Sequence, residues 1–202
     1  MTKIKLCGLS RRCDIEAANA LMPDYVGFVF AEGSKRRVTP AQARALKNAL
    51  SPRIRAVGVF VDEAPETVAG LLADGTVEIA QLHGREDEAW LARLRRLTAA
   101  PVIRAFRVRG AADIRRAEAS RADAVLLDAG AGEGKTFDWE LLREMGRPYF
   151  LAGGLNPGNV ASAVRALRPY AVDVSTGIET DGRKDIVKMR AFMQAVERTE
   201  ST

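Results

Sequence analysis

Two reactive side chains stand at equivalent places in this chain, each at the end of a short apolar run. Cys7 closes the run over residues 4–7, and Asp128 directly follows the run over residues 124–127. Thiols and carboxylic acids both take and give protons in enzymes. If the two runs are buried parallel strands, their carboxyl ends bring both side chains to one face. The pair then indicates acid–base chemistry; the alternatives are a cysteine that only packs and an aspartate that only forms a turn.

Two glycine-bearing segments indicate an anion site near the same face. Gly153 and Gly154 follow the apolar run over residues 149–152, and Ser175, Thr176 and Gly177 follow the run over 171–174. Backbone N–H groups at such turns and at helix starts bind phosphate. The alternative is that these glycines only permit tight turns. Because both segments carry glycine, and the second also carries hydroxyl groups, we expect a phosphate site.

Two further side chains are candidates for ligand contacts. Arg36 lies in the basic segment 34–37 after the second apolar run, where a guanidinium suits a carboxylate, although charge runs are usually just solvated. His83 is the only histidine and follows the fourth run. Imidazole groups in general exchange protons near neutral pH. A single histidine more often has a structural than a catalytic role. We therefore expect His83 to contact the substrate and not to be one of the two catalytic residues.

The glycine-rich segment 130–136 superficially ends like a nucleotide-binding P-loop. That motif needs a glycine where this chain has Ala129, and a helix that begins at the lysine. Lys135 and Thr136 are instead followed by Phe137. We therefore interpret residues 130–136 as a lid beside Asp128.

The elements that must position these residues alternate along the whole chain. Eight short apolar runs read as strands buried on both faces. They cover residues 4–7, 25–30, 56–61, 78–82, 102–106, 124–127, 149–152 and 171–174. Helical segments are predicted over residues 14–21, 41–50, 63–73, 86–97, 111–119, 138–144, 156–167 and 185–196. This alternation predicts an α/β fold, one (β/α)8 TIM barrel spanning residues 1–202, whose chemistry lies after the strands.

Composition narrows the function classes. The net charge of +5 comes from 31 basic and 26 acidic residues that are interleaved, and aromatic residues are only 6% of the chain, which speaks against nucleic-acid binding. No run approaches the roughly 20 apolar residues of a membrane span, and the start leaves no room for a signal peptide. The two cysteines form neither a disulfide framework nor a zinc motif. We expect a cytoplasmic protein without a metal.

Taken together, the motifs closely resemble the phosphoribosylanthranilate isomerase family of tryptophan biosynthesis. They occur in the family's order over nearly the whole chain. The matching segments are residues 5–9, 27–30 with 34–36, 57–61, 81–84, 126–128, 134–139, 151–157, 172–179 and 182–185. Arg37 departs from a tyrosine that is common in the family, which leaves Arg36 and Arg37 as alternatives for the carboxylate contact.

The resemblance implies a cofactor-free Amadori rearrangement of N-(5′-phosphoribosyl)anthranilate to 1-(2-carboxyphenylamino)-1-deoxyribulose 5-phosphate. It implies that Asp128 is the general acid and Cys7 the general base. It further implies that Arg36 holds the anthranilate carboxylate, while the loops after the seventh and eighth strands hold the phosphate. The partner is then a small phosphorylated substrate, and the sequence leaves a monomer and a homodimer equally open.

Two other functions compete with this interpretation. A broader aminoaldose isomerase would also take the histidine-pathway substrate, but related barrels of that type use two aspartates rather than Cys7 and Asp128. A phosphate-binding barrel without catalysis would serve as a regulatory or assembly partner. The intact thiol and carboxylic acid speak against it.

Overall fold

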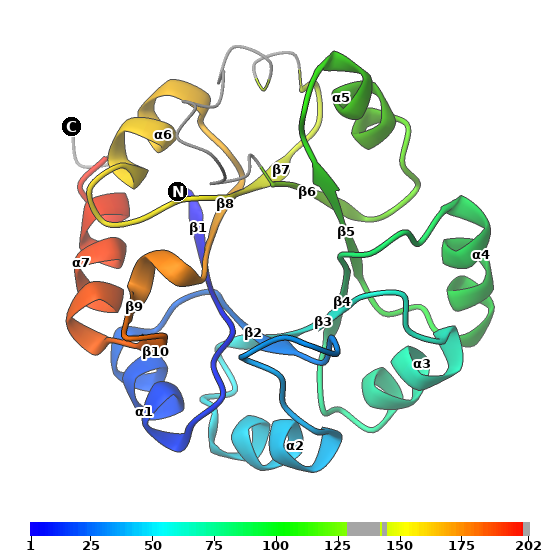
Figure 1. Cartoon of the computed structure of the whole chain (residues 1–202), viewed down its shortest axis with the longest axis horizontal. Coiled ribbons are helices and arrows are strands. Elements are labelled where there is room, and N and C mark those ends of the chain that lie inside the picture. The colour runs from blue at the N-terminus through cyan, green and yellow to red at the C-terminus, as the bar shows by residue number, and fades with distance from the viewer. Residues whose placement is uncertain (129–141, 143–144, 200–202) are drawn as a thin grey trace.

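The predicted strands close into a parallel barrel with the helices outside it (Figure 1). This computed structural model describes residues 1–128, 142 and 145–199. Consecutive strands pair with one another, and β1 pairs with β8 to close the ring. The strands are β1 Lys3–Cys7, β2 Tyr25–Val29, β3 Arg55–Phe60, β4 Ile79–Leu82, β5 Val102–Arg107, β6 Ala124–Asp128, β7 Tyr149–Ala152 and β8 Ala171–Val174. The predicted (β/α)8 barrel is thereby confirmed.

The helices form the outer layer of the molecule (Figure 1). They are α1 Arg12–Leu21, α2 Pro40–Ala49, α3 Pro65–Ala73, α4 Glu88–Leu97, α5 Ala111–Glu118, α6 Val160–Leu167 and α7 Ile186–Glu197. The predicted helix over 138–144 lies outside the described residues apart from Leu142, and so does the predicted lid over 130–136. Within the described residues, none of the helices combines the length and hydropathy that a membrane span needs.

Three helices begin later than predicted because of their local capping. α3 begins at Pro65, whose fixed φ suits the first turn of a helix. Asp87 caps α4 by accepting a backbone hydrogen bond of 2.8 Å. Before α6, Asn156 Oδ1 accepts a hydrogen bond of 2.8 Å from the Gly158 N–H, which makes a turn and delays the helix to Val160.

Side chains of the strands alternate between two apolar cores. Leu6 and Leu127 belong to the larger core, between the barrel and the helices. Tyr25, Leu126 and Phe150 belong to the smaller core, inside the barrel. Because successive side chains of a strand point to opposite faces, this alternation identifies which residues face the barrel interior.

By that alternation, polar residues occupy part of the interior. Leu6 on β1 faces the helices, so its neighbours Lys5 and Cys7 face inward. Val172 and Val174 belong to the outer core in the same way, which places Asp173 on the inside. A thiol, an ammonium group and a carboxylate therefore share the interior of two adjacent strands.

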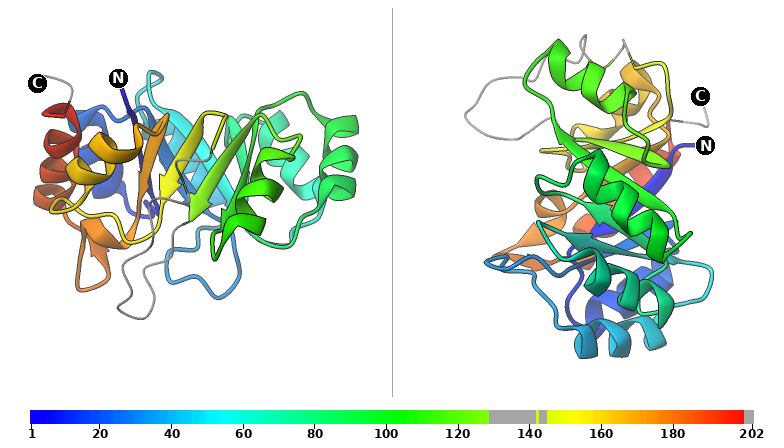
Figure 2. Two further views of the ribbon diagram at one scale, coloured as in Figure 1. Left: turned by 90° about the horizontal axis from the view of Figure 1, so that it is seen from above. Right: turned by 90° about the vertical axis from the view of Figure 1, so that its right-hand side faces the viewer.

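One element after β8 is absent from the sequence prediction. A short 3₁₀ helix, η2 Thr176–Ile178, leads into a hairpin of β9 Glu179–Thr180 and β10 Arg183–Lys184. Figure 2 (left) shows this hairpin and the loop after β2 at the end of the barrel opposite the N-terminus. The hairpin therefore stands at the carboxyl end of the strands.

Candidate active site

A cavity of about 250 Å³ opens at the carboxyl end of the barrel. Its lining comes from residues at or after seven of the eight strands, and it includes all but one of the predicted site residues. Those residues are Cys7, Arg36, His83, Asp128, Gly153, Gly154, Ser175 and Thr176. Residues separated by more than a hundred positions in the chain thus surround one space.

Gly177, the remaining predicted residue, has a different place. A Cβ atom on Gly177 would lie 1.9 Å from the carbonyl oxygen of Leu155, so only glycine fits there. The two loops predicted to hold phosphate are therefore packed directly against each other. On the second loop, Ser175 lines the cavity, and its carbonyl oxygen accepts a hydrogen bond of 2.9 Å from Lys184 Nζ.

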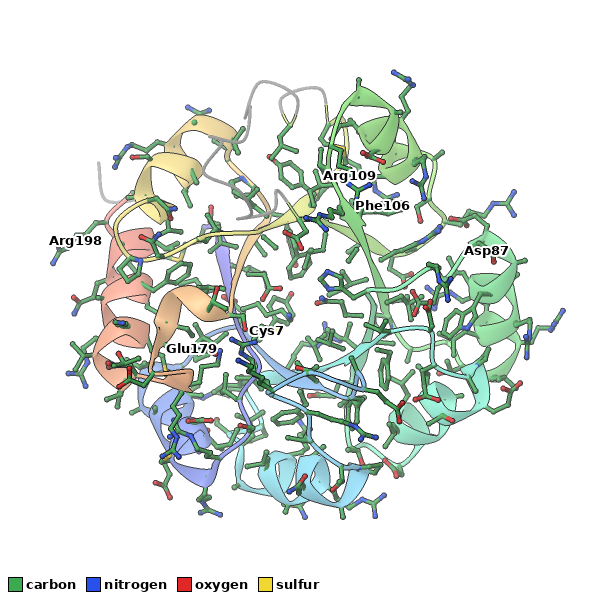
Figure 3. The ribbon with its side chains drawn as sticks, in the orientation of Figure 1. Cys7, Asp87, Phe106, Arg109, Glu179 and Arg198 are labelled. Atoms are coloured by element: carbon green, nitrogen blue, oxygen red, sulfur yellow. The ribbon has the colours of Figure 1, made fainter. Side chains whose placement is uncertain are left out.

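Cys7 ends β1 with its side chain in the barrel interior. A Cβ atom on Gly27, its register partner in β2, would lie 2.7 Å from Cys7 Sγ. Gly27 therefore makes the room that the thiol occupies. Figure 3 shows Cys7 on the β1 side of the ring, near Glu179 of the hairpin.

The charges around Cys7 act on its thiol in opposite directions. Burial raises the pKa of Cys7 above its ordinary value, and the negative charge of Asp173 adds to this effect. The positive charges of Lys5 and Lys184 lower the pKa of the thiol. Among the described residues, the principal cationic influence on Cys7 is thus Lys5.

Lys5 and Asp173 form an ion pair in the barrel interior. Lys5 Nζ donates to both carboxylate oxygens of Asp173 at 3.0 Å, and the two side chains are 0% and 8% exposed. The residues are partners in the register of β1 and β8. Although burial acts to lower the pKa of Lys5, Asp173 and Cys7 raise it on balance, so the ammonium form is favoured.

Arg36 is held by a carboxylate of the hairpin. Its Nε and Nη2 atoms donate to the two oxygens of Glu179 at 2.6 and 2.5 Å, and Lys184 Nζ donates to Glu179 at 2.6 Å. Arg37 instead approaches Glu32 at 3.7 Å on an exposed surface. Arg36, and not Arg37, lines the cavity, which favours Arg36 as the carboxylate contact.

The opposite wall of the cavity carries Asp128 and His83. His83 Nε2 lies 3.6 Å from Asp128 Oδ2, too far for a hydrogen bond but within reach of a small shift. Gln81 Nε2 lies 3.1 Å from His83 Nδ1. With the amide as donor, the ring proton of a neutral His83 is on Nε2, toward the carboxylate.

Gln81 also presents a polar atom to the cavity. Its side chain is 1% exposed, and its Oε1 atom is buried without a hydrogen-bond partner among the described residues. Gln81 lines the cavity, so a bound ligand with a donor group can satisfy this oxygen.

Several residues near the site are not predicted from the sequence, because they are neither reactive residue types at strand ends nor glycines of the loops. They are Lys5, Gln81, Asp173, Glu179 and Lys184, whose types are normally exposed. The alternation of side chains along a strand could have identified Lys5, Gln81 and Asp173. Each stands two residues before a predicted site residue, namely Cys7, His83 and Ser175. Glu179 and Lys184 belong to the hairpin that the sequence prediction lacks.

The other end of the barrel holds a second cavity of about 290 Å³. Aromatic and aliphatic side chains of the strand starts line much of it, including Tyr25, Ile79, Ile103 and Phe150. It contains none of the predicted site residues, and no group of three potential metal ligands exists among the described residues. The predicted site residues that line a cavity therefore all lie at the carboxyl end.

Comparisons with known proteins identify the family of this chain. The family model described as N-(5′-phosphoribosyl)anthranilate (PRA) isomerase matches residues 4–195. A curated N-(5′-phosphoribosyl)anthranilate isomerase from Endomicrobium trichonymphae is 44% identical over 194 residues, covering 94% of this chain and 95% of the relative. One from Desulforudis audaxviator is 44% identical over 206 residues, covering 96% and 97%.

Solved structures give the same result. Phosphoribosyl anthranilate isomerase from Thermotoga maritima superposes with a TM-score of 0.89 at 37% identity, covering 98% of this chain and 100% of that chain. A complex of such an enzyme with reduced 1-(o-carboxyphenylamino)-1-deoxyribulose 5-phosphate has a TM-score of 0.87 at 36% identity, with 98% and 100% covered.

Proposed function

The chain belongs to the N-(5′-phosphoribosyl)anthranilate isomerase family, and we propose that it performs this isomerisation with Cys7 as general base and Asp128 as general acid. The chain is an isomerase of tryptophan biosynthesis. The observation that carries the residue assignment is that Cys7 and Asp128 line the same cavity as Gly153 and Gly154 of the loop after β7.

The first step opens the ribose ring. Asp128 gives its proton to the ring oxygen as the bond from that oxygen to C1′ breaks, and the nitrogen lone pair forms a protonated Schiff base with C1′. The acid must be protonated beforehand, and the negatively charged substrate favours that form. His83, 3.6 Å from Asp128, is suited to orienting the carboxyl group or the released oxygen.

The second step removes a proton from carbon. Cys7 takes the proton from C2′, and the electron pair of that bond forms a double bond between C1′ and C2′ while the nitrogen regains its lone pair. The enolamine then becomes the ketone when C1′ gains a proton and the C2′ hydroxyl loses one. No atoms are gained or lost overall, so the reaction requires no redox partner.

The ends of the substrate have separate partners. Arg36 lines the cavity and carries a fixed positive charge suited to the anthranilate carboxylate. The loops that contain Gly153, Gly154, Ser175 and Thr176 supply the phosphate site. A related enzyme was solved with a phosphorylated ketose analogue, which supports a ligand of this class.

An assay that follows the fluorescence of phosphoribosylanthranilate tests the assignment. Cys7→Ala and Asp128→Asn should each reduce kcat by about 10²-fold or more, because each removes one proton transfer. Binding of the product analogue should persist in both variants. Near-normal kcat in either variant would refute the role of that residue, and absent turnover in the unaltered protein would favour the non-catalytic phosphate-binding barrel.

Arg36→Ala should raise KM far more than it lowers kcat. An unchanged KM would move the carboxylate contact to another residue.

We further propose a cytoplasmic location. We expect a monomer or a homodimer, since one relative from Thermotoga maritima is described as dimeric with monomers generated from it. Sedimentation of the full chain measures this directly.

A further inference from the structure

The charged groups around Cys7 do not balance among themselves. Among the residues that the structure describes, three cations face its surroundings: Lys5 from β1, Lys184 from β10 and Arg36 from the loop after β2. Two carboxylates pair with them, since Asp173 binds Lys5 and Glu179 binds both other cations. This cluster therefore carries one positive charge more than negative, and a thiolate at Cys7 would neutralise it.

Lys5 is the cation best placed to act on the thiol. It stands two residues before Cys7 on the same strand, so both side chains point into the barrel interior. Its ammonium group is completely buried, where charge interactions are screened less than at the surface. Arg36 and Lys184 share their charge with the intervening Glu179.

Stability alone gives a poor reason for a lysine at this position. Replacing a buried ion pair by apolar residues is often neutral or stabilising, because removing two charges from water is expensive. Tyr25, the register partner of Lys5 on the neighbouring strand β2, belongs instead to the apolar inner core. An ion pair at Lys5 and Asp173 thus calls for a function that an apolar pair cannot supply.

We propose that Lys5, clamped by Asp173, is a positioning residue whose positive charge stabilises the anionic form of Cys7 that acts as the base. The inference rests on the proposed role of Cys7. Asp173 keeps the ammonium group charged and fixed through two hydrogen bonds of 3.0 Å. Burial by itself raises the pKa of Cys7, and the charge of Lys5 opposes that effect most strongly.

The experiment titrates Cys7 in the free protein. The chain has two cysteines, and Cys13→Ala leaves Cys7 as the remaining one. Because Cys13 is exposed, its replacement should disturb the fold little. Thiolate formation is followed by ultraviolet absorbance and by the rate of alkylation with iodoacetamide as the pH rises. The same protein with Cys7→Ala added provides the baseline that removes the tyrosine signal.

Two variants and one control are compared in this background. Lys5→Met removes the charge and keeps most of the side-chain volume. Lys5→Met combined with Asp173→Asn removes the whole pair and leaves no unpaired buried charge, which protects folding. Lys3→Met is the control, because Lys3 lies on the same strand and face but is 40% exposed and one layer further from Cys7.

Lys5→Met should move the midpoint of the Cys7 titration upward by about one pH unit or more. The double variant should raise the midpoint less, because the loss of Asp173 removes a charge that opposes the thiolate. At a fixed pH below the midpoint, kcat should fall about tenfold for each pH unit by which the midpoint rises, while KM changes little. The control should titrate like the parent protein.

Folded Lys5 variants that titrate like the parent protein would overturn the proposal, because a purely structural lysine changes the melting temperature without moving the midpoint. The titration needs no substrate. It therefore decides the role of Lys5 independently of the Cys7→Ala assay, which decides the general-base assignment.

Discussion

Glu179 carries a strongly stabilised charge at the edge of the site. Its burial acts to raise the carboxyl pKa, but hydrogen bonds from Arg36 and Lys184 outweigh this and lower the pKa to about 2 from an ordinary 4.5. A carboxyl group with a depressed pKa in the folded state contributes stability above its unfolded pKa. That contribution is lost as the pH falls from about 4.5 toward 2.

Glu179→Gln should therefore destabilise the protein at neutral pH, on the order of 2 kcal/mol, and this difference should shrink as the pH falls toward 2. Urea denaturation of both proteins at stepped pH values measures it. Glu16→Gln is the control, since Glu16 pairs with Arg12 on an exposed helix face. A stability difference that is independent of pH would contradict the assigned ion pairs.

Residue types explain which side chains the sequence reveals. Cys7 and Asp128 stand out because a strand end is where a barrel presents reactive groups. Lys5 and Asp173 do not stand out, since a lysine at the start of a chain normally reads as solvated surface. Alternation from Cys7 indicates that Lys5 faces inward, but only the strand register, which pairs Lys5 with Asp173, brings the two residues together.

Among the elements, the β9–β10 hairpin has the most direct effect on the site. It places Glu179 opposite Lys184 in its register, and Glu179 in turn holds Arg36. Its two-residue turn, Asp181 and Gly182, has φ values of 51° and 73°. Positive φ at both positions is typical of the turn that best fits a tight hairpin, and glycine adopts it without strain.

Gly182→Ala should strain this turn and loosen Arg36, which raises KM for the substrate with a smaller effect on kcat. Gly75→Ala is a matched control, because Gly75 also has φ 73° and open space around it but follows α3, before the start of β4. Both variants should lose roughly 1 kcal/mol of stability. Equal effects of both on KM would show that the hairpin does not control Arg36.

Element prediction succeeds and fails for identifiable reasons. All eight strands of the barrel follow from apolar runs, because strands covered on both sides carry a strong hydrophobic signal. The hairpin strands have two residues each and show no periodicity. The Asp181-Gly182 pair is nevertheless a recognised hairpin signal, so the turn itself was predictable.

At the scale of the whole molecule, the two ends of the barrel have different characters. At the amino end, an aromatic cluster lines the cavity of about 290 Å³, and the Phe150 ring lies 5.5 Å from Tyr25 and 5.7 Å from Tyr170 between ring centroids. The carboxyl end carries the ionisable groups of the site. The aromatic contacts of the amino end are thereby separated from the ionisable groups of the site.

Phe150→Ala should cost about 3–5 kcal/mol of unfolding free energy, because it leaves a void in the inner core. Its kcat and KM should stay close to those of the parent protein when assayed well below the melting temperature. Denaturant unfolding and the fluorescence assay measure the two effects. A large loss of kcat in folded protein would show that the two ends are coupled.

Barrel closure follows from the count of alternating elements, because eight strand–helix units favour a closed sheet. The composition of the interior does not follow from that count. It depends on which alternate residues turn inward, and in strands such as β2 and β7 the two faces are similarly apolar. Tyr25 and Phe150 could therefore be assigned to the inner core only once the register was known.

In the Arg36–Glu179 pair, the Glu179 carboxylate occupies hydrogen-bond donors of Arg36 that the carboxylate of the ligand could otherwise use. A guanidinium has five N–H donors, and Nε and Nη2 are already engaged by Glu179. Glu179 already holds the Arg36 side chain in one position, so binding of the substrate carboxylate costs little side-chain entropy. That carboxylate can use only the N–H donors that Glu179 leaves unoccupied. Substrate and product carry the same carboxylate, and a one-sided grip limits the affinity for both, which favours product escape after each turnover.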